Sequence, residues 1–264
     1  MRLKRSAGED DENCSHHFTG MGGKDERRIT LMLRVKNLSK HFGDLRALDQ
    51  ISFEVPRNSV TGIIGPNGAG KTTLLLGLAG LMPIDSGSIC WGDTVISANA
   101  RCHTSFYVED AIQPHSLLSA GSVLGFYASV FKREKALLDD ILDRLMLREF
   151  LRSRVSVLSK GTAKRFLIAI GLLSTQPVLM LDEPFDGLDL KQTLEVIPLL
   201  RQISAAGRTL VLSIHQLRDA ERICDRFVLL NNGRLAGSGT LPELQTIAGG
   251  AQGSGLEEIF LALT

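Results

Sequence analysis

Hydrophobic and polar positions change their pattern several times along the chain. At 33–38 and 49–55 apolar and polar residues alternate, which predicts two strands with one solvated face and therefore an antiparallel edge sheet. Short apolar runs elsewhere predict buried strands at 59–64, 177–181, 209–214 and 226–230, and a further short strand at 88–91. Helical patterns at 73–79, 191–205 and 217–224 fall between these runs. This alternation predicts an α/β fold with a mostly parallel sheet, covered by helices on both faces.

The middle of the chain has a different texture. Between 111 and 160 the strand patterns stop and helical spacing replaces them, most clearly at 133–150, where apolar residues recur at intervals of three and four. We interpret about 111–172 as a helical insertion subdomain within the α/β domain. The residues that carry the periodicity are Leu137, Leu138, Ile141, Leu142 and Leu145.

Bulk properties narrow the class of protein. The 264 residues are 44% hydrophobic and 22% charged, which is enough to bury one large core with an attached subdomain. The 30 basic and 29 acidic residues nearly cancel, so charge gives no reason to expect a nucleic-acid partner. No apolar run reaches the 18 or more residues that span a bilayer. The four cysteines form no C-x-x-C pair and fit a reducing cytosol.

The first thirty or so residues look different from the rest. They are polar and aperiodic, and the acidic run at 9–12 lies where a signal peptide would have its apolar region. We expect a disordered extension at 1–32 and a single domain at 33–264, with Met21 or Met32 as alternative biological starts. Cys14, His16 and His17 have no second ligand cluster, so a solvated tail is favoured there over a metal site.

One segment carries a specific chemistry. Residues 65–73 satisfy the pattern G-x-x-x-x-G-K-[ST] through Gly65, Gly70, Lys71 and Thr72. Glycines allow successive backbone N–H groups to point at phosphate oxygens, the lysine reaches the β- and γ-phosphates, and the threonine hydroxyl binds Mg²⁺. A strand precedes the loop and a helix follows it, as a phosphate-binding loop (P-loop) requires. The whole segment, Gly65, Pro66, Asn67, Gly68, Ala69, Gly70, Lys71, Thr72 and Thr73, is therefore a predicted nucleotide site in a P-loop NTPase.

Two carboxylates follow the apolar strand at 177–181. Asp182 and Glu183 would lie at the carboxyl edge of the sheet, beside the P-loop, where ligands collect in such folds. Asp182 is placed to hold Mg²⁺ through water, and Glu183 to polarise the water that attacks the γ-phosphate. We predict the first to order the metal and the second to order the nucleophile.

With these motifs in place, the chain resembles the nucleotide-binding domain of an ABC transporter over about 33–264. The resemblance implies that Phe42 stacks on adenine, although an edge-strand core residue is the plainer alternative. It also implies that 186–189 is the D-loop, with Asp189 in it, and that His215 is the switch histidine that hydrogen-bonds the γ-phosphate. Lys71, Glu183 and His215 are then the catalytic residues, and ATP and Mg²⁺ the cofactors.

The family signature is altered in this sequence. The usual Leu-Ser-Gly-Gly-Gln reads here as residues 158–162, with Lys160 for the first glycine and Thr162 for the glutamine, while Ser159 and Gly161 remain. A serine N-cap and the positive end of the helix expected at 163–173 would still offer donors to a γ-phosphate held by another protomer. Lys160 either adds charge there or faces solvent, and the sequence favours neither.

The Q-loop is also unusual. The family normally has a glutamine after a strand near the start of the helical insertion, and Glu109 is the residue that fits best, with Gln113 as the competing candidate. Glutamate at this position could contact Mg²⁺ or its water, so Glu109 joins Thr72 and Asp182 as a candidate metal residue.

The resemblance implies that each chain supplies half of each catalytic site. The P-loop, Glu183 and His215 act in cis, and Ser159 and Gly161 come from a second copy, so a homodimer is expected. An integral membrane permease is the expected partner, with this chain in the cytoplasm on the inner face of the membrane. The ending 255–264 and the Leu-Ser-Lys-Gly signature resemble export ATPases that work with separate permeases. Rival interpretations are a soluble ABC clamp in DNA repair or translation and a weakly hydrolysing regulatory subunit.

Overall fold

The structure is a computed structural model that describes residues 31–110, 116–249 and 253–264. Four expectations lie outside these residues: the disordered extension up to residue 30, the Cys14 cluster, the first residues of the helical insertion, and Gln113. In the part of the chain that is described, no helix combines the length and the apolar character needed to cross a bilayer.

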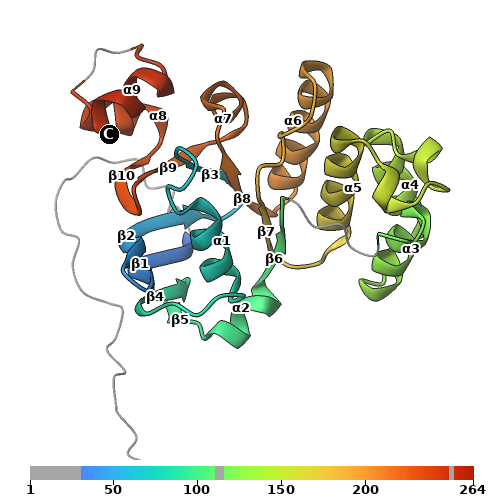
Figure 1. Ribbon diagram of the computed structural model, residues 1–264, viewed down its shortest axis with the longest axis horizontal. Coiled ribbons are helices and arrows are strands. Elements are labelled where there is room, and N and C mark those ends of the chain that lie inside the picture. The colour runs from blue at the N-terminus through green and yellow to red at the C-terminus, as the bar shows by residue number, and fades with distance from the viewer. Residues whose placement is uncertain (1–30, 111–115, 250–252) are drawn as a thin grey trace, which may run out of the picture.

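A six-stranded sheet forms the centre of the molecule, in the order β10-β9-β3-β8-β7-β6 (Figure 1). Five of its strands are parallel, and only β10 runs antiparallel to its neighbour β9. Every residue of β3, β7 and β8 is buried, which explains their continuous apolar character. The prediction of a mostly parallel sheet is therefore confirmed. The strands are β3 (Val60–Ile64), β6 (Ser105–Val108), β7 (Val178–Leu181), β8 (Thr209–Ile214), β9 (Arg226–Asn231) and β10 (Arg234–Gly239).

A second, four-stranded sheet is antiparallel throughout, in the order β2-β1-β4-β5. This confirms the antiparallel sheet predicted from alternation. The two long strands exceed their predicted lengths because they pair as a hairpin through the turn at Gly43, which adopts φ +57°. The strands are β1 (Leu31–Phe42), β2 (Leu45–Pro56), β4 (Ser86–Trp91) and β5 (Thr94–Val95).

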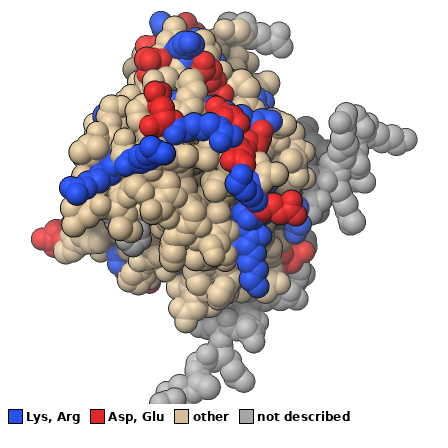
Figure 2. Space-filling model, turned by 90° about the vertical axis from the view of Figure 1, so that its right-hand side faces the viewer, with Lys and Arg blue, Asp and Glu red and all other residues tan. Residues whose placement is uncertain are grey.

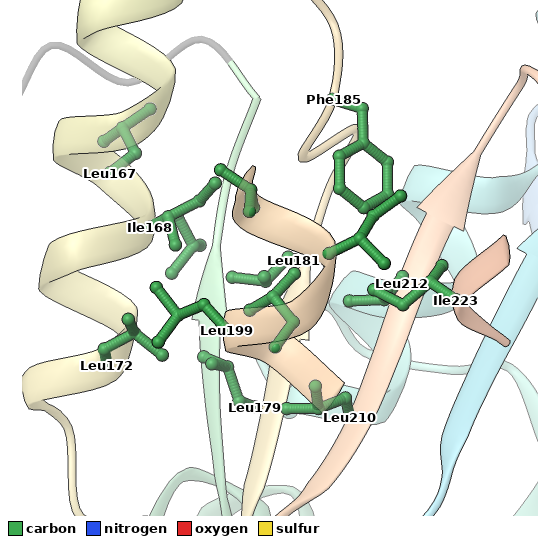
Figure 3. Packing of buried hydrophobic residues seen from close by; sticks show 14 of the residues in the cluster. Leu167, Ile168, Leu172, Leu179, Leu181, Phe185, Leu199, Leu210, Leu212 and Ile223 are labelled. Carbon is green, nitrogen blue, oxygen red and sulfur yellow. The ribbon is translucent and has the colours of Figure 1, made fainter. Parts of the chain in front are cut away.

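Strand periodicity divides the apolar core into two parts. In β7, Val178 and Met180 face the first helix and the antiparallel sheet, whereas Leu179 and Leu181 face the opposite side. There they pack against helix side chains such as Leu199 and Ile168 (Figure 3). Burial on both faces fixes the register of the central strands, and with it the positions of the residues that follow them.

The helices lie outside the sheets, and three of them form a group at one end of the molecule. In Figure 1, α3, α4 and α5 gather at the end remote from the antiparallel sheet. The C-terminal residues form a short helix, α9, and β10, α2 and α8 had not been predicted. The helices are α1 (Lys71–Ala79), α2 (Ala98–Thr104), α3 (Ala120–Val130), α4 (Lys135–Arg144), α5 (Lys160–Leu173), α6 (Leu190–Ala205), α7 (Leu217–Ile223), α8 (Leu241–Ile247) and α9 (Leu256–Leu263), with short 3₁₀ turns at Arg148–Phe150 and Val155–Val157.

The helix predicted at 133–150 is wrong in its extent. The α-helix α4 stops at Arg144, and Met146 adopts a positive φ of 49°. This break lets Leu145 and Leu147 both enter the core, and Arg165 from α5 donates to the carbonyls of Leu145 and Met146. Tertiary contacts therefore end a helix whose apolar spacing continues.

Candidate functional site

The P-loop joins β3 to α1 at the centre of the parallel sheet. Gly68 and Gly70 adopt φ values of +81° and +100°, which residues with side chains rarely adopt. A Cβ on Gly70 would also lie 2.5 Å from the Ala47 carbonyl oxygen, and one on Gly65 would collide with the Leu230 carbonyl oxygen. The loop is closed by the Ala69 amide, which donates to the Pro66 carbonyl at 3.1 Å. Glycine is therefore required at 65, 68 and 70, and these positions let the backbone follow the path of an anion-binding loop.

An open cleft lies over this loop. Its lining joins the P-loop to the residues after β6 and β7 and to the turn after β9, which reach the same edge of the six-stranded sheet, and to the β1–β2 hairpin of the antiparallel sheet. Asp110, Asp182 and Glu183 bring three carboxylates to it, and Lys71 and Arg46 bring two cations. The lining residues are Phe42, Leu45, Arg46, Ala47, Asn67, Gly68, Gly70, Lys71, Thr72, Thr73, Asp110, Asp182, Glu183 and Asn232.

Lys71 lies at the first position of α1 and is 7% exposed. Its ammonium donates to the carbonyls of Gly65 and Pro66 at 2.9 and 3.3 Å. The same Nζ is 3.3 Å from Glu183 Oε1. The cation predicted to bind phosphates is therefore already fixed between the loop and the predicted general base.

Asp182 is buried at the carboxyl end of β7 and accepts three hydrogen bonds. Thr72 donates to Oδ2 at 2.8 Å, Tyr107 to the same oxygen at 3.0 Å, and Ser213 to Oδ1. Burial and the Asp182 carboxylate raise the pKa of Tyr107 well above its ordinary value, so its phenol stays protonated as a donor. This network brings together Thr72 and Asp182, the two residues predicted to act on the metal.

Tyr107 and Ser213 were missed by sequence reasoning. Both lie near the ends of strands that flank β7, Tyr107 on β6 and Ser213 on β8. Ser213 also accepts a hydrogen bond from the Glu183 amide at 2.9 Å, so it fixes both carboxylate residues. A search for polar residues near the ends of apolar strands would have found them, once the order β6-β7-β8 was known.

Glu183 has a strained backbone conformation and lies between Lys71 and His215. Its φ is 48°, uncommon for a residue other than glycine and a frequent feature of functional sites. One carboxylate oxygen faces Lys71, and the other lies 2.6 Å from His215 Nδ1. The His215 side chain is 41% exposed at the end of β8. The predicted base and switch histidine are thus in direct contact, and of the two only Glu183 is among the residues that line the P-loop cleft.

The donor atoms at this edge suit Mg²⁺. A hydroxyl (Thr72) and a carboxylate (Asp182) lie 2.8 Å apart beside the P-loop, and both offer the oxygen ligands that this ion prefers. Among the described residues there is no cluster of three or more His, Cys, Asp or Glu able to enclose a metal. This matches the way Mg²⁺ binds nucleotides, with few protein ligands and the remainder from phosphates and water.

The signature residues lie at the start of α5. Ser159 is exposed and caps the helix, since its hydroxyl accepts from the Thr162 amide at 3.3 Å. The helix therefore begins at Lys160, three residues earlier than predicted. Gly161 is buried, and a Cβ there would lie 2.8 Å from the Gly187 carbonyl oxygen. Neither Ser159 nor Gly161 lines the P-loop cleft of its own chain.

Lys160 faces solvent, one of the two roles considered from sequence, and it also makes an ion pair that the sequence did not suggest. Its ammonium lies 2.7 Å from Asp186 Oδ2, at the start of the D-loop, and its stem runs over Gly187. The hydrogen bond between them lowers the pKa of Asp186 and raises the pKa of Lys160. Because the lysine is largely exposed, the pair contributes little to stability, but it joins signature and D-loop within one chain. Asp189 in turn caps α6 through a capping box with Gln192.

Phe42 and the Q-loop complete the predicted set. Phe42 is 47% exposed at the end of β1 and lines the cleft, with Lys40 Nζ 5.4 Å from its ring centroid. Its exposure is unlike that of a core residue and leaves the ring accessible for stacking. Glu109 is half-buried and is not among the residues that line the cleft, whereas the adjacent Asp110 is. The metal role of Glu109 stays a prediction.

Comparison with known proteins places this site in a family. The ABC transporter family matches residues 48–186. The Nod factor export ATP-binding protein I of Ralstonia nicotianae is 32% identical over 226 residues, which is 82% of this chain and 70% of the relative. The daunorubicin resistance ATP-binding protein DrrA3 of Streptomyces coeruleorubidus is 33% identical over 224 residues, 83% of this chain and 71% of the relative.

Structural comparison agrees. The solved structure of an ATP-binding subunit of an ABC transporter superposes with a TM-score of 0.78 at 29% identity, covering 88% of this chain and 99% of that one. The matched residues 48–186 contain the P-loop, Asp182, Glu183 and the signature, and therefore include much of the cleft and the start of α5. The chain therefore belongs to the ABC transporter family, as an ATP-binding protein with a P-loop NTPase fold.

Proposed function

We propose that the chain hydrolyses ATP at the interface of two copies and drives transport through a separate membrane permease. The observation that carries the hydrolysis is the position of Glu183 at the mouth of the cleft, between Lys71 and His215. An ionised carboxylate there can accept the proton of an attacking water, while the P-loop amides and Lys71 bind the phosphates. Mg²⁺, held by Thr72 and Asp182, would supply charge neutralisation of the triphosphate.

The exposed end of α5 supports the dimer. A helix N-terminus capped by Ser159 is an anion site, but it does not line the cleft of its own chain. In a head-to-tail pair, each exposed signature would face the nucleotide of the other protomer, and ATP would join the two. Binding would then close the pair, and hydrolysis would release it.

A permease partner is supported by the face of the helical region. Helix α3 has no charged residue, and Leu117, Leu118, Phe126 and Val130 on or just before it are exposed. Figure 2, which looks at the side of the molecule formed by α3 and α4, shows a wide uncharged area beside a belt of charged side chains. An exposed apolar surface of this kind is typical of a protein contact. We propose that it receives the cytoplasmic surface of the permease.

Export is the proposed direction. The two relatives described above are named for Nod factor export and for daunorubicin resistance. These names favour a transport subunit over a soluble clamp in DNA repair or translation. The hydrolytic arrangement around Glu183 likewise favours an ATPase over a regulatory subunit with little turnover. We place the chain on the cytoplasmic face of the membrane, where ATP is available.

The partner proposal is tested by purifying the tagged chain from membranes and identifying the proteins that come with it. We expect a multi-span protein in the eluate, and ATPase activity that rises when the two are reconstituted together. Val130→Asp on α3 should lose the partner by placing a charge in an apolar contact, while keeping basal ATPase activity.

Val95→Asp is the matched control, because Val95 is exposed to the same degree on β5, 56% against 54% for Val130. The control should keep the partner. Equal loss of the partner in both variants, or recovery of none from membranes, would contradict the docking proposal. Reconstituted vesicles that accumulate substrate on the side holding ATP would contradict export.

A further inference from the structure

Lys164 is a buried cation that the site described so far does not use. It lies in the second turn of α5 and is only 4% exposed. Its ammonium donates to the Asp110 carboxylate, to the Asp110 carbonyl at 3.3 Å and to the Asp182 carbonyl at 3.4 Å. A lysine buried to this degree normally has a charged partner, and here that partner lies in the wall of the nucleotide cleft.

Asp110 is the reason this contact matters for the nucleotide. Its side chain is 40% exposed and lines the same cleft as Lys71, Asp182 and Glu183. The three carboxylates that line the cleft would repel a triphosphate, and the cations in the lining are Lys71, which pairs with Glu183, and Arg46, which pairs with Asp49 outside the cleft. Lys164 offsets the charge of Asp110, because its buried ammonium donates to that carboxylate although Lys164 itself does not line the cleft.

We propose that Lys164 is a positioning residue of the nucleotide site. It holds Asp110 in place, compensates the charge of that carboxylate, and ties the cleft wall to α5, whose first residues form the signature. The link to α5 rests on the proposed function, since it matters only if Ser159 acts on a partner's nucleotide. The positioning and charge compensation of Asp110 concern the affinity of a single chain for nucleotide and do not require a dimer.

Lys164 connects segments that are also hydrogen-bonded to each other. The carbonyl of Asp182 accepts from Lys164, and the amide of Asp182 donates to the Val108 carbonyl of β6 at 2.9 Å. Lys164 therefore contacts the segments that follow two neighbouring strands, Asp110 after β6 and Asp182 after β7. A displacement of Asp110 by arriving phosphate charge would act directly on the Lys164 side chain. Charge interactions of this kind are strong where water is partly excluded.

The test separates charge from packing with four variants. Lys164→Met keeps the length of the stem but removes the ammonium, Asp110→Asn removes the carboxylate, and the double variant removes both. Lys164→Arg keeps the positive charge. The affinity of the full chain for Mg·ADP is measured by isothermal titration calorimetry, with circular dichroism to confirm folding. ADP is used because its binding requires neither hydrolysis nor a second protomer.

We expect Lys164→Met to weaken Mg·ADP binding about tenfold, because Asp110 is left as an uncompensated charge in the cleft. Asp110→Asn alone should bind at least as tightly as the unmodified chain. The double variant should recover to within about threefold of it, and Lys164→Arg, which keeps the charge, should bind normally. The loss in Lys164→Met should also shrink as salt is raised.

A double variant as weak as Lys164→Met would overturn the proposal, because it would show that the lysine acts through packing alone. Unchanged affinity in a folded Lys164→Met would overturn it as well. Neither result depends on dimerisation. Failure of the chain to pair with ATP would therefore count against the proposed function and leave this measurement intact.

Discussion

Glu183→Gln is expected to abolish ATP turnover while leaving ATP binding intact. The amide keeps the size of the side chain and its position beside His215, but it cannot accept the proton of the attacking water. A general base typically contributes 100-fold to 10,000-fold, so we expect kcat to fall by at least about 100-fold. Loss of the negative charge next to Lys71 should leave ATP affinity equal or higher.

The measurement is steady-state phosphate release alongside ATP titration under the same conditions. Glu195→Gln is the matched control, since it makes the same change at an exposed position on α6 and should hydrolyse ATP normally. Full turnover in a folded Glu183→Gln protein would remove Glu183 from the role of general base. A group other than Glu183 would then have to activate the attacking water.

Lys71→Ala is expected to damage binding itself. The ammonium is held by the carbonyls of Gly65 and Pro66 and points into the cleft, so its loss removes a charged donor to the phosphates. A hydrogen bond to a charged group contributes about 1.5–3 kcal/mol, which corresponds to a rise of roughly 10-fold to 150-fold in the Kd for ATP. Titration with a fluorescent ATP analogue measures this change.

The same variant leaves Glu183 without its cation, so a loss of stability has to be separated from a loss of contact. Lys71→Met keeps the buried stem and should show the same loss of affinity with less loss of thermal stability. Unchanged ATP affinity in either folded variant would exclude Lys71 from phosphate binding. The contrast with Glu183→Gln, which binds but does not turn over, distinguishes the two roles.

Much of the fold and of the cleft could be predicted because their signals are local. The strand before Gly65 and the helix after Lys71 are adjacent in sequence, and an apolar strand that ends in Asp182 needs only its own residues to be recognised. Parallel strands bring such ends together at one edge of the sheet, so adjacency of the P-loop and Asp182 followed from the fold class.

The remaining features depend on contacts between distant segments. Lys160 pairs with Asp186 and Lys164 with Asp110 because α5 packs against the loops after β7 and β6, which spacing along the chain does not reveal. The end of α4 depends on Arg165 from another helix. Asp110 lines the cleft and the adjacent Glu109 does not. Neighbouring residues after a strand can point to opposite sides, and the sequence pattern does not show which of the two faces the cleft.

We propose that ATP is bound between the P-loop of one chain and the signature of another. Light scattering of Glu183→Gln with saturating Mg·ATP tests it most directly, since the chain of 28.7 kDa should double its mass and revert when ATP is removed. Adding Ser159→Asp should prevent this, because the cap is kept but a negative charge faces phosphate, whereas Ser159→Asn should still pair. A mass that stays monomeric although ATP is bound, or a dimer indifferent to Ser159→Asp, would contradict the account.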